Sequence, residues 1–131
     1  MKKNGILNHR LSDVIARMGH TQRLVIADAG LPIPLGVERI DLAVLPGLPG
    51  VLDLARAIGH ELQVEGVVLA EELLDHNQQI PNEVRALFAG ATVRTVPHEE
   101  FKRMCEGAVA IVRSGECTPY ANIMLISGVT F

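Results

Sequence analysis

The strongest constraint on the fold is the alternation of short apolar runs with segments of helical periodicity along the chain. Apolar or β-branched runs predict strands at residues 24–27, 39–44, 64–70, 92–96, 108–112 and 122–127. Apolar residues at helical spacing predict helices over 7–18, 51–58, 82–89 and 98–105, with a short helical turn over 71–76. Such alternation is typical of an α/β fold with a largely parallel sheet and helices on both faces. We therefore predict a single compact domain over residues 1–131.

The first candidate functional residue follows the first predicted helix. Asn8 can cap the start of this helix, and Gly19 suits the left-handed residue after its end. His20 then lies in the connection between this helix and the strand at 24–27, where its imidazole is free to project. An imidazole titrates close to neutral pH, so His20 is a candidate proton donor. The plainer interpretation is an ordinary surface histidine.

A second candidate lies at the other end of the same strand. Asp28 directly follows the apolar run, and Gly30, Pro32 and Pro34 impose a stiff, irregular turn after it. Open α/β sheets bind their ligands at the carboxyl ends of strands, which makes Asp28 a candidate binding residue. Two structural alternatives stay open. Asp28 can form an Asx turn into Gly30, or it can orient His20 if the loop folds back.

The remaining candidates lie near the later strands. His98 and Lys102 belong to the helix that follows Pro97, and Tyr120 and Asn122 come just before the last strand. Tyrosine and asparagine supply neutral hydrogen-bond donors and acceptors that match sugar hydroxyls. The same residues can also serve the core or cap a helix. The other three histidines, His9, His60 and His76, fall on polar helix faces or helix ends and are interpreted as solvated.

Several functional classes are disfavoured by composition and motifs. A net charge of −3, three Phe, one Tyr and no Trp argue against nucleic-acid binding. The glycines at 47 and 50 lack the pattern of a phosphate loop, and no zinc-protease or nucleophile-elbow motif occurs. A metal site of His20, Asp28 and His98 is an alternative without a recognised ligand spacing. We therefore expect neither metal nor cofactor.

The cellular setting is predicted from the same kind of evidence. The start of the chain has no apolar run of signal-peptide length, and no apolar run is long enough to span a membrane. Cys105 and Cys117 lack the CxxC spacing, and Cys105 falls on an apolar helix face. We expect a cytoplasmic protein that binds no membrane.

The string GHTQRLVIADAGLPIP at 19–34 resembles the signature of the ribose pyranase and fucose mutarotase family, closer to its ribose branch. The likeness extends to GILN near the start, to VPHEEFK at 96–102 and to SGECTPYANIMLISGVTF at the end. The resemblance implies a D-ribose pyranase, an isomerase that interconverts the β-pyranose and β-furanose forms of ribose. It also implies a ring-shaped homodecamer. By the same resemblance His20 is the proton donor, and Asp28, His98, Tyr120 and Asn122 bind the sugar, with Lys102 also matching.

Two alternatives remain at this point: a non-catalytic sugar-binding accessory to transport, and a mutarotase for another sugar such as fucose. The apolar end of the chain, Val129-Thr130-Phe131, independently suggests contact with a neighbouring subunit. We expect a homo-oligomer with its sugar pocket near a subunit junction.

Overall fold

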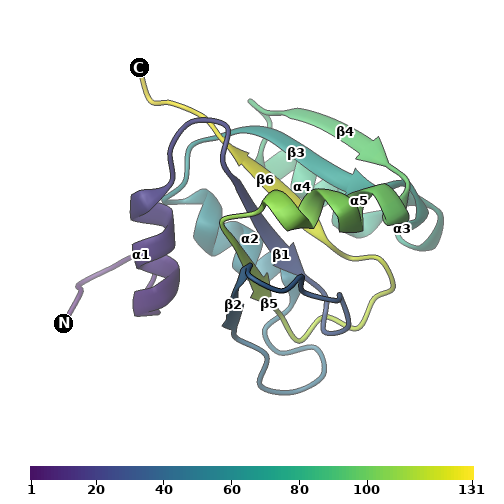
Figure 1. Ribbon diagram of the computed structural model, residues 1–131, viewed down its shortest axis with the longest axis horizontal. Helices are drawn as coiled ribbons and strands as arrows, with labels where there is room; N and C mark the ends of the chain where they lie inside the picture. Colours follow the sequence, from purple (N-terminus) through teal and green to yellow (C-terminus); the bar gives the residue numbers. More distant parts are fainter.

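A six-stranded sheet forms the middle layer of the computed structural model, which describes residues 1–131 (Figure 1). The strands are β1 (Arg23–Ala27), β2 (Glu38–Asp41), β3 (Val64–Ala70), β4 (Thr92–Val96), β5 (Ala110–Arg113) and β6 (Ile123–Ser127). Their order across the sheet is β2-β5-β1-β6-β3-β4. All neighbours are parallel except β6, which is antiparallel to β1 and β3. The predicted largely parallel sheet is therefore confirmed.

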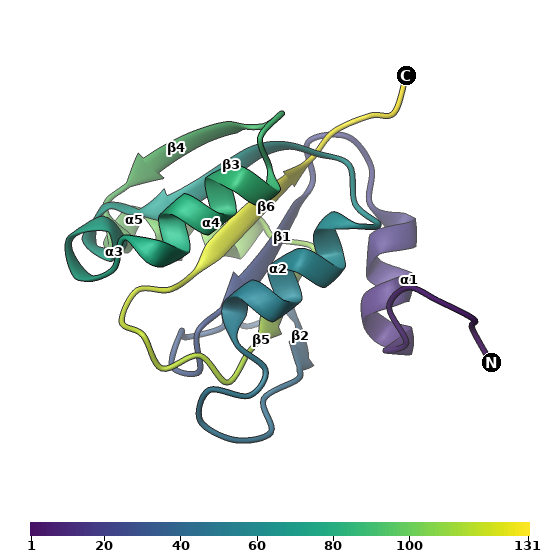
Figure 2. The same cartoon turned by 180° about the vertical axis from the view of Figure 1, so that it is seen from behind.

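Helices cover both faces of this sheet, as predicted. They are α1 (His9–Arg17), α2 (Val51–Gly59), α3 (Glu71–His76), α4 (Gln79–Leu87) and α5 (His98–Met104). Figure 2 shows α1, α2 and α4 on one side of the sheet, and Figure 1 shows α5 on the other. None of these helices has both the length and the apolarity needed to cross a bilayer.

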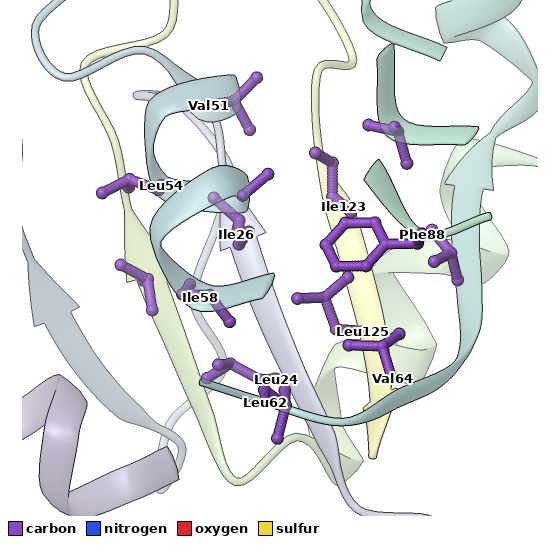
Figure 3. Close-up of a cluster of buried hydrophobic side chains, with 14 of the residues drawn as sticks. Leu24, Ile26, Val51, Leu54, Ile58, Leu62, Val64, Phe88, Ile123 and Leu125 are labelled. Atoms are coloured by element: carbon purple, nitrogen blue, oxygen red, sulfur yellow. The ribbon is translucent and has the colours of Figure 1, made fainter. Parts of the chain in front are cut away.

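The two faces of β1 explain why its sequence is apolar throughout. Leu24 and Ile26 pack with α2 in the larger core cluster, which Figure 3 shows. Val25 and Ala27 point to the opposite face and belong to the smaller cluster under α5. Cys105 is buried in that smaller cluster, and burial raises the pKa of its thiol to about 11. It is a core residue, as its helix position predicted.

Two local expectations are wrong. Gly19 does not adopt the left-handed conformation, because Met18 ends α1 in an extended conformation and the positive φ falls on Thr21 instead, at 67°. Asn82 does not cap α4, which begins at Gln79. The side chain of Asn77 accepts a hydrogen bond from the Ile80 N–H at 2.8 Å and satisfies the start of that helix.

Candidate functional site

The carboxyl end of β1 holds a hydrogen-bonded pair of polar side chains. Because β1 and β6 are antiparallel, Asp28 after β1 lies beside Asn122 before β6. The Asp28 N–H donates to Asn122 Oδ1 at 2.8 Å, and Asn122 Nδ2 donates to Asp28 Oδ2 at 3.1 Å. The Gly30 N–H donates to Asp28 Oδ1 at 3.0 Å, so the alternative Asx turn is present as well. Asn122 is completely buried, so this pair is a fixed part of the fold.

Tyr120 lies between two histidine rings. The His98 ring meets it edge to face at a centroid distance of 5.0 Å, and the His76 ring lies 5.2 Å away at a tilt of 31°. His76 is exposed, as the sequence predicts, but its contact with Tyr120 could not be predicted from the sequence. Tyr120 has a φ of 62°, which an L-residue adopts only where its surroundings impose it.

His98 is held through its backbone while its ring keeps a free polar atom. The His98 N–H donates to both carboxylate oxygens of Glu72, at 2.9 and 3.1 Å. His98 Nδ1 is buried and has no hydrogen-bond partner. Buried polar atoms normally have partners, so this unpartnered nitrogen is an exception that a functional role can explain. Lys102 follows one turn later on α5, where its Nζ lies 2.6 Å from Glu99 and its hydrogen bond holds the pKa of Glu99 below the usual range.

Glu116 secures the loop that carries Tyr120 and Asn122. Its carboxylate accepts hydrogen bonds from the N–H and the hydroxyl of Thr118, at 3.1 and 2.9 Å, and from the Val51 N–H at 3.3 Å. Burial raises the pKa of Glu116, but these hydrogen bonds outweigh it and lower the pKa overall. Sequence reasoning missed this residue, since its partner Val51 lies far away along the chain.

His20 does not join this group within the chain. It lies before β1, whereas Asp28 lies after it, and five strand residues between them span about 17 Å. Figure 1 shows the turn before β1 near the C-terminus, at the opposite end of the sheet from the loops after β1 and before β6. His20 Nε2 instead contacts Glu65 Oε2 at 2.8 Å. Asp28 is therefore not the orienting partner of His20.

The alternative metal site is likewise not assembled within one chain. His20, Asp28 and His98 are divided between the two ends of β1, and no three His, Cys, Asp or Glu side chains gather closely enough to hold a metal ion. The largest hollow on the surface, about 570 Å³ beside Lys2 and His60, includes none of the candidate site residues.

Comparison with known proteins assigns the chain to a family. A family model described as the RbsD / FucU transport protein family matches residues 1–130. The chain belongs to this family. The resemblance found in the sequence is thereby confirmed.

Its relatives in this family match over the full length. The D-ribose pyranase of Laribacter hongkongensis is 53% identical over 131 residues, covering all of both chains. The D-ribose pyranase of Geobacillus kaustophilus is 50% identical, covering 100% of this chain and 96% of that protein.

Solved structures share the fold. The structure of Bacillus subtilis RbsD complexed with D-ribose matches with a TM-score of 0.96 and 46% identity, covering all of both chains. The fucose mutarotase of Streptococcus pneumoniae, in complex with L-fucose, matches with a TM-score of 0.77 and 24% identity, covering 95% of each chain. This second likeness shows the shared fold alone.

Proposed function

We propose that this protein acts as a D-ribose pyranase, an isomerase that interconverts the β-pyranose and β-furanose forms of D-ribose. The observation that carries the proposal is identity of about half, over the whole chain, to relatives that bear this name. The geometry agrees with the chemistry, because the group at the carboxyl end of β1 presents amide, carboxylate, phenol and imidazole groups. These groups can donate to and accept from the hydroxyls of a sugar.

The reaction requires only proton exchange at positioned atoms. Opening the pyranose removes the proton of the anomeric hydroxyl, breaks the bond between C1 and the ring oxygen, and gives a proton to that oxygen. Closure through the C4 hydroxyl forms the furanose and returns both protons by the reverse exchange. Positioned acid–base groups accelerate such steps about 10²- to 10⁴-fold. Sugar rings already open unaided in water, so this gain suffices.

The two ends of β1 supply the two parts of this chemistry. Asp28, His98, Lys102, Tyr120 and Asn122 bind and orient the sugar hydroxyls. The buried, unpartnered Nδ1 of His98 and the fixed Asp28–Asn122 pair support this role. His20 exchanges the proton, for which an imidazole is suited at neutral pH.

A complete pocket then needs His20 of one chain beside Asp28 of another. Both ends of the sheet expose apolar side chains that a neighbouring copy would cover. Val129 and Phe131 lie at the His20 end, and Leu35, Val44, Leu45 and Leu48 lie in loops at the Asp28 end. His20 itself lines an open hollow of about 490 Å³ together with residues 127–131. Contact between two different surfaces is head-to-tail, and such contacts form a ring when their rotation closes, which would fit a homo-oligomer such as a decamer.

Deleting Gly128–Phe131 tests this assembly. The deletion removes the apolar end of the chain, so light scattering should show smaller species, and ribose exchange should fall together with assembly. The deletion leaves the β6 pairing with β1 and β3 in place, and circular dichroism checks that the subunit still folds. An active monomer at working concentration would refute the proposed head-to-tail pocket.

The competing function is a sugar-binding accessory to transport, as the description of the family suggests. Saturation-transfer NMR on the anomeric protons of ribose separates the two. The enzyme should raise pyranose–furanose exchange at catalytic concentration, whereas an accessory would bind ribose and leave exchange unchanged. Fucose is tested in parallel. If the protein speeds the anomeric exchange of fucose more than that of ribose, it is a mutarotase of different specificity.

We further propose that the activity needs no metal or cofactor and that the protein works in the cytoplasm. The reaction requires only proton exchange, and Cys117 is an exposed free thiol, the form that a reducing compartment maintains. Exchange should persist after prolonged chelation. A loss of exchange that zinc restores would contradict this part of the proposal.

A further inference from the structure

We propose that Glu65 is the positioning residue of His20, which selects the ring nitrogen that exchanges protons with the sugar. This inference rests on the proposed function for its kinetic consequence. The observation behind it is the contact of 2.8 Å between His20 Nε2 and Glu65 Oε2. The two residues are 45 positions apart: His20 lies in the turn before β1, and Glu65 lies in β3.

A bulge in β3 aims Glu65 toward His20. Val64 pairs with Ser127 and Gly66 pairs with Ile126, so Glu65 is an extra residue with no partner on β6. A bulge of this kind turns a side chain out of the regular alternation, and bulges recur beside active sites for that reason. The sequence alone presents Glu65 only as a polar residue in an otherwise apolar strand.

The end of β6 leaves room for the contact. Because β6 lies between β1 and β3, these two strands are about 10 Å apart, and the side chains of His20 and Glu65 meet past the end of β6. Gly128 follows β6 near this gap. A Cβ on Gly128 would lie 3.0 Å from Glu65 Cβ and 3.4 Å from Glu65 Oε2. A side chain at this position would therefore crowd Glu65.

The turn that carries His20 is fixed as well. The Gly19 N–H donates to the side-chain oxygen of Gln22 at 2.8 Å, and the Gln22 N–H donates back to the Gly19 carbonyl at 3.3 Å. The Thr21 N–H donates to the Ser127 carbonyl at 2.8 Å, with Thr21 at a φ of 67°. A β-branched residue in this conformation marks a turn whose shape is imposed by its surroundings.

The chemical consequence follows from what a carboxylate can do. A carboxylate only accepts hydrogen bonds, so His20 Nε2 carries the hydrogen and donates to Glu65 Oε2. In neutral His20 the lone pair then resides on Nδ1. Nδ1 is therefore the atom that takes a proton from the sugar and returns one to it. Glu65 acts by fixing the tautomer and the ring orientation of His20, and it does not touch the substrate.

Glu65→Ala tests the proposal, with Glu65→Gln as the conservative variant. Without the carboxylate the imidazole rotates and samples both tautomers, so kcat for ribose exchange should fall about tenfold, within the range that misplacing a reacting group can cost. The Kd for ribose should change little, because Glu65 contacts His20 and does not itself bind the sugar. Glu65→Gln should retain more activity than Glu65→Ala, since its amide oxygen still accepts from Nε2.

Further measurements distinguish a loss of His20 positioning from a general loss of protein stability. The side chains of His20 and Glu65 are about half exposed, and exposed pairs add little stability, so Glu65→Ala should keep the melting temperature. Glu106→Ala is the matched control, since Glu106 is exposed and makes no hydrogen bond or ion pair, and its kcat should equal that of the wild type. Long-range proton–nitrogen spectra of histidine-labelled protein at alkaline pH should show His20 protonated at Nε2 in the wild type and mixed in Glu65→Ala.

The measurements distinguish a wrong role for Glu65 from a wrong proposed function. If wild-type protein does not speed ribose exchange, the proposed function is wrong, while the ring spectra still report whether Glu65 holds His20. Wild-type kcat in Glu65→Ala, or a wild-type His20 ring protonated at Nδ1, would overturn the positioning role.

Discussion

The two ends of β1 differ in how completely a single chain builds them. At the carboxyl end, Asn122 is fully buried and Asp28 receives hydrogen bonds from two neighbours. At the amino end, His20 is half exposed and has one side-chain partner, Glu65. The proposed binding group is therefore preformed by the fold, whereas the proposed proton donor lies on an open surface that a neighbouring copy would cover.

Both ends of β1 nevertheless have a residue with a strained backbone conformation nearby. The only non-glycine residues with a positive φ are Thr21, next to His20, and Tyr120 in the binding group. Such conformations cost free energy and persist where the surroundings impose them, and they cluster at functional sites. Their placement, one in each half, supports a site made from both ends.

The largest expected effect is at the amino end. His20→Ala removes the proposed proton-exchanging group, so kcat for ribose exchange should fall by about 10²-fold or more. The Kd for ribose should change much less, because the imidazole is one of several hydrogen-bonding groups. Saturation-transfer NMR and calorimetry measure the two quantities. A folded variant that binds ribose and turns over at the wild-type rate would remove His20 from the mechanism and transfer its role to His98.

A change at the carboxyl end of β1 should weaken ribose binding more than it lowers kcat. Asn122→Ala removes a hydrogen-bonding amide and frees Asp28, so ribose should bind about tenfold more weakly, the loss of about one to two hydrogen bonds. The kcat at saturating ribose should fall less than the affinity does. Melting temperature is recorded alongside, because Asn122 is buried and its loss also leaves the Asp28 N–H without a partner. Unchanged affinity with reduced kcat would contradict the division of roles.

The smallest effect concerns the turn at Thr21. Thr21→Gly relieves the left-handed strain and should raise the free energy of unfolding by about 1 kcal/mol. Thr21→Ala is the matched control, since alanine is strained at the same φ and should bring no such gain. Denaturant unfolding measures both. Equal stability of the two variants would show that the positive φ carries no strain.

Much of the fold could be predicted because apolar patterning determines it. The run at 24–27 is apolar at every position since both of its faces are buried, and this alone indicates an internal strand of a covered sheet. The reversed direction of β6 could not be predicted, because an apolar strand has the same pattern in either direction. The start of α4 could not be predicted for a local reason: asparagine is a common capping residue type and occurs at both 77 and 82, and the sequence does not decide between them.

The residues of the candidate site could be proposed from the sequence, but their layout could not. Asp28, Tyr120 and Asn122 stand out because each borders an apolar strand, and the structure places them at one edge. The pairing of His20 with Glu65 depends on a bulge in β3 and on the strand order, neither of which a single sequence reveals. The sequence shows that β1 separates His20 from Asp28. The proposal that a pocket is shared between two copies needed the structure, which shows the two residues at opposite ends of the sheet.

Mixing two inactive variants tests the central claim, that each pocket joins opposite ends of β1 from two copies. His20→Ala retains an intact binding end, and a second variant, Asp28→Asn, retains an intact proton donor. Asp28→Asn should bind ribose too weakly to exchange it at a ribose concentration well below the wild-type Kd, at which all samples are compared. When the two are unfolded together and refolded as mixed oligomers, about a quarter of head-to-tail junctions should combine both intact ends. The account predicts that ribose exchange returns to about a quarter of the wild-type rate, while each variant refolded alone stays inactive. Mixed oligomers that remain as inactive as the separate variants would contradict it.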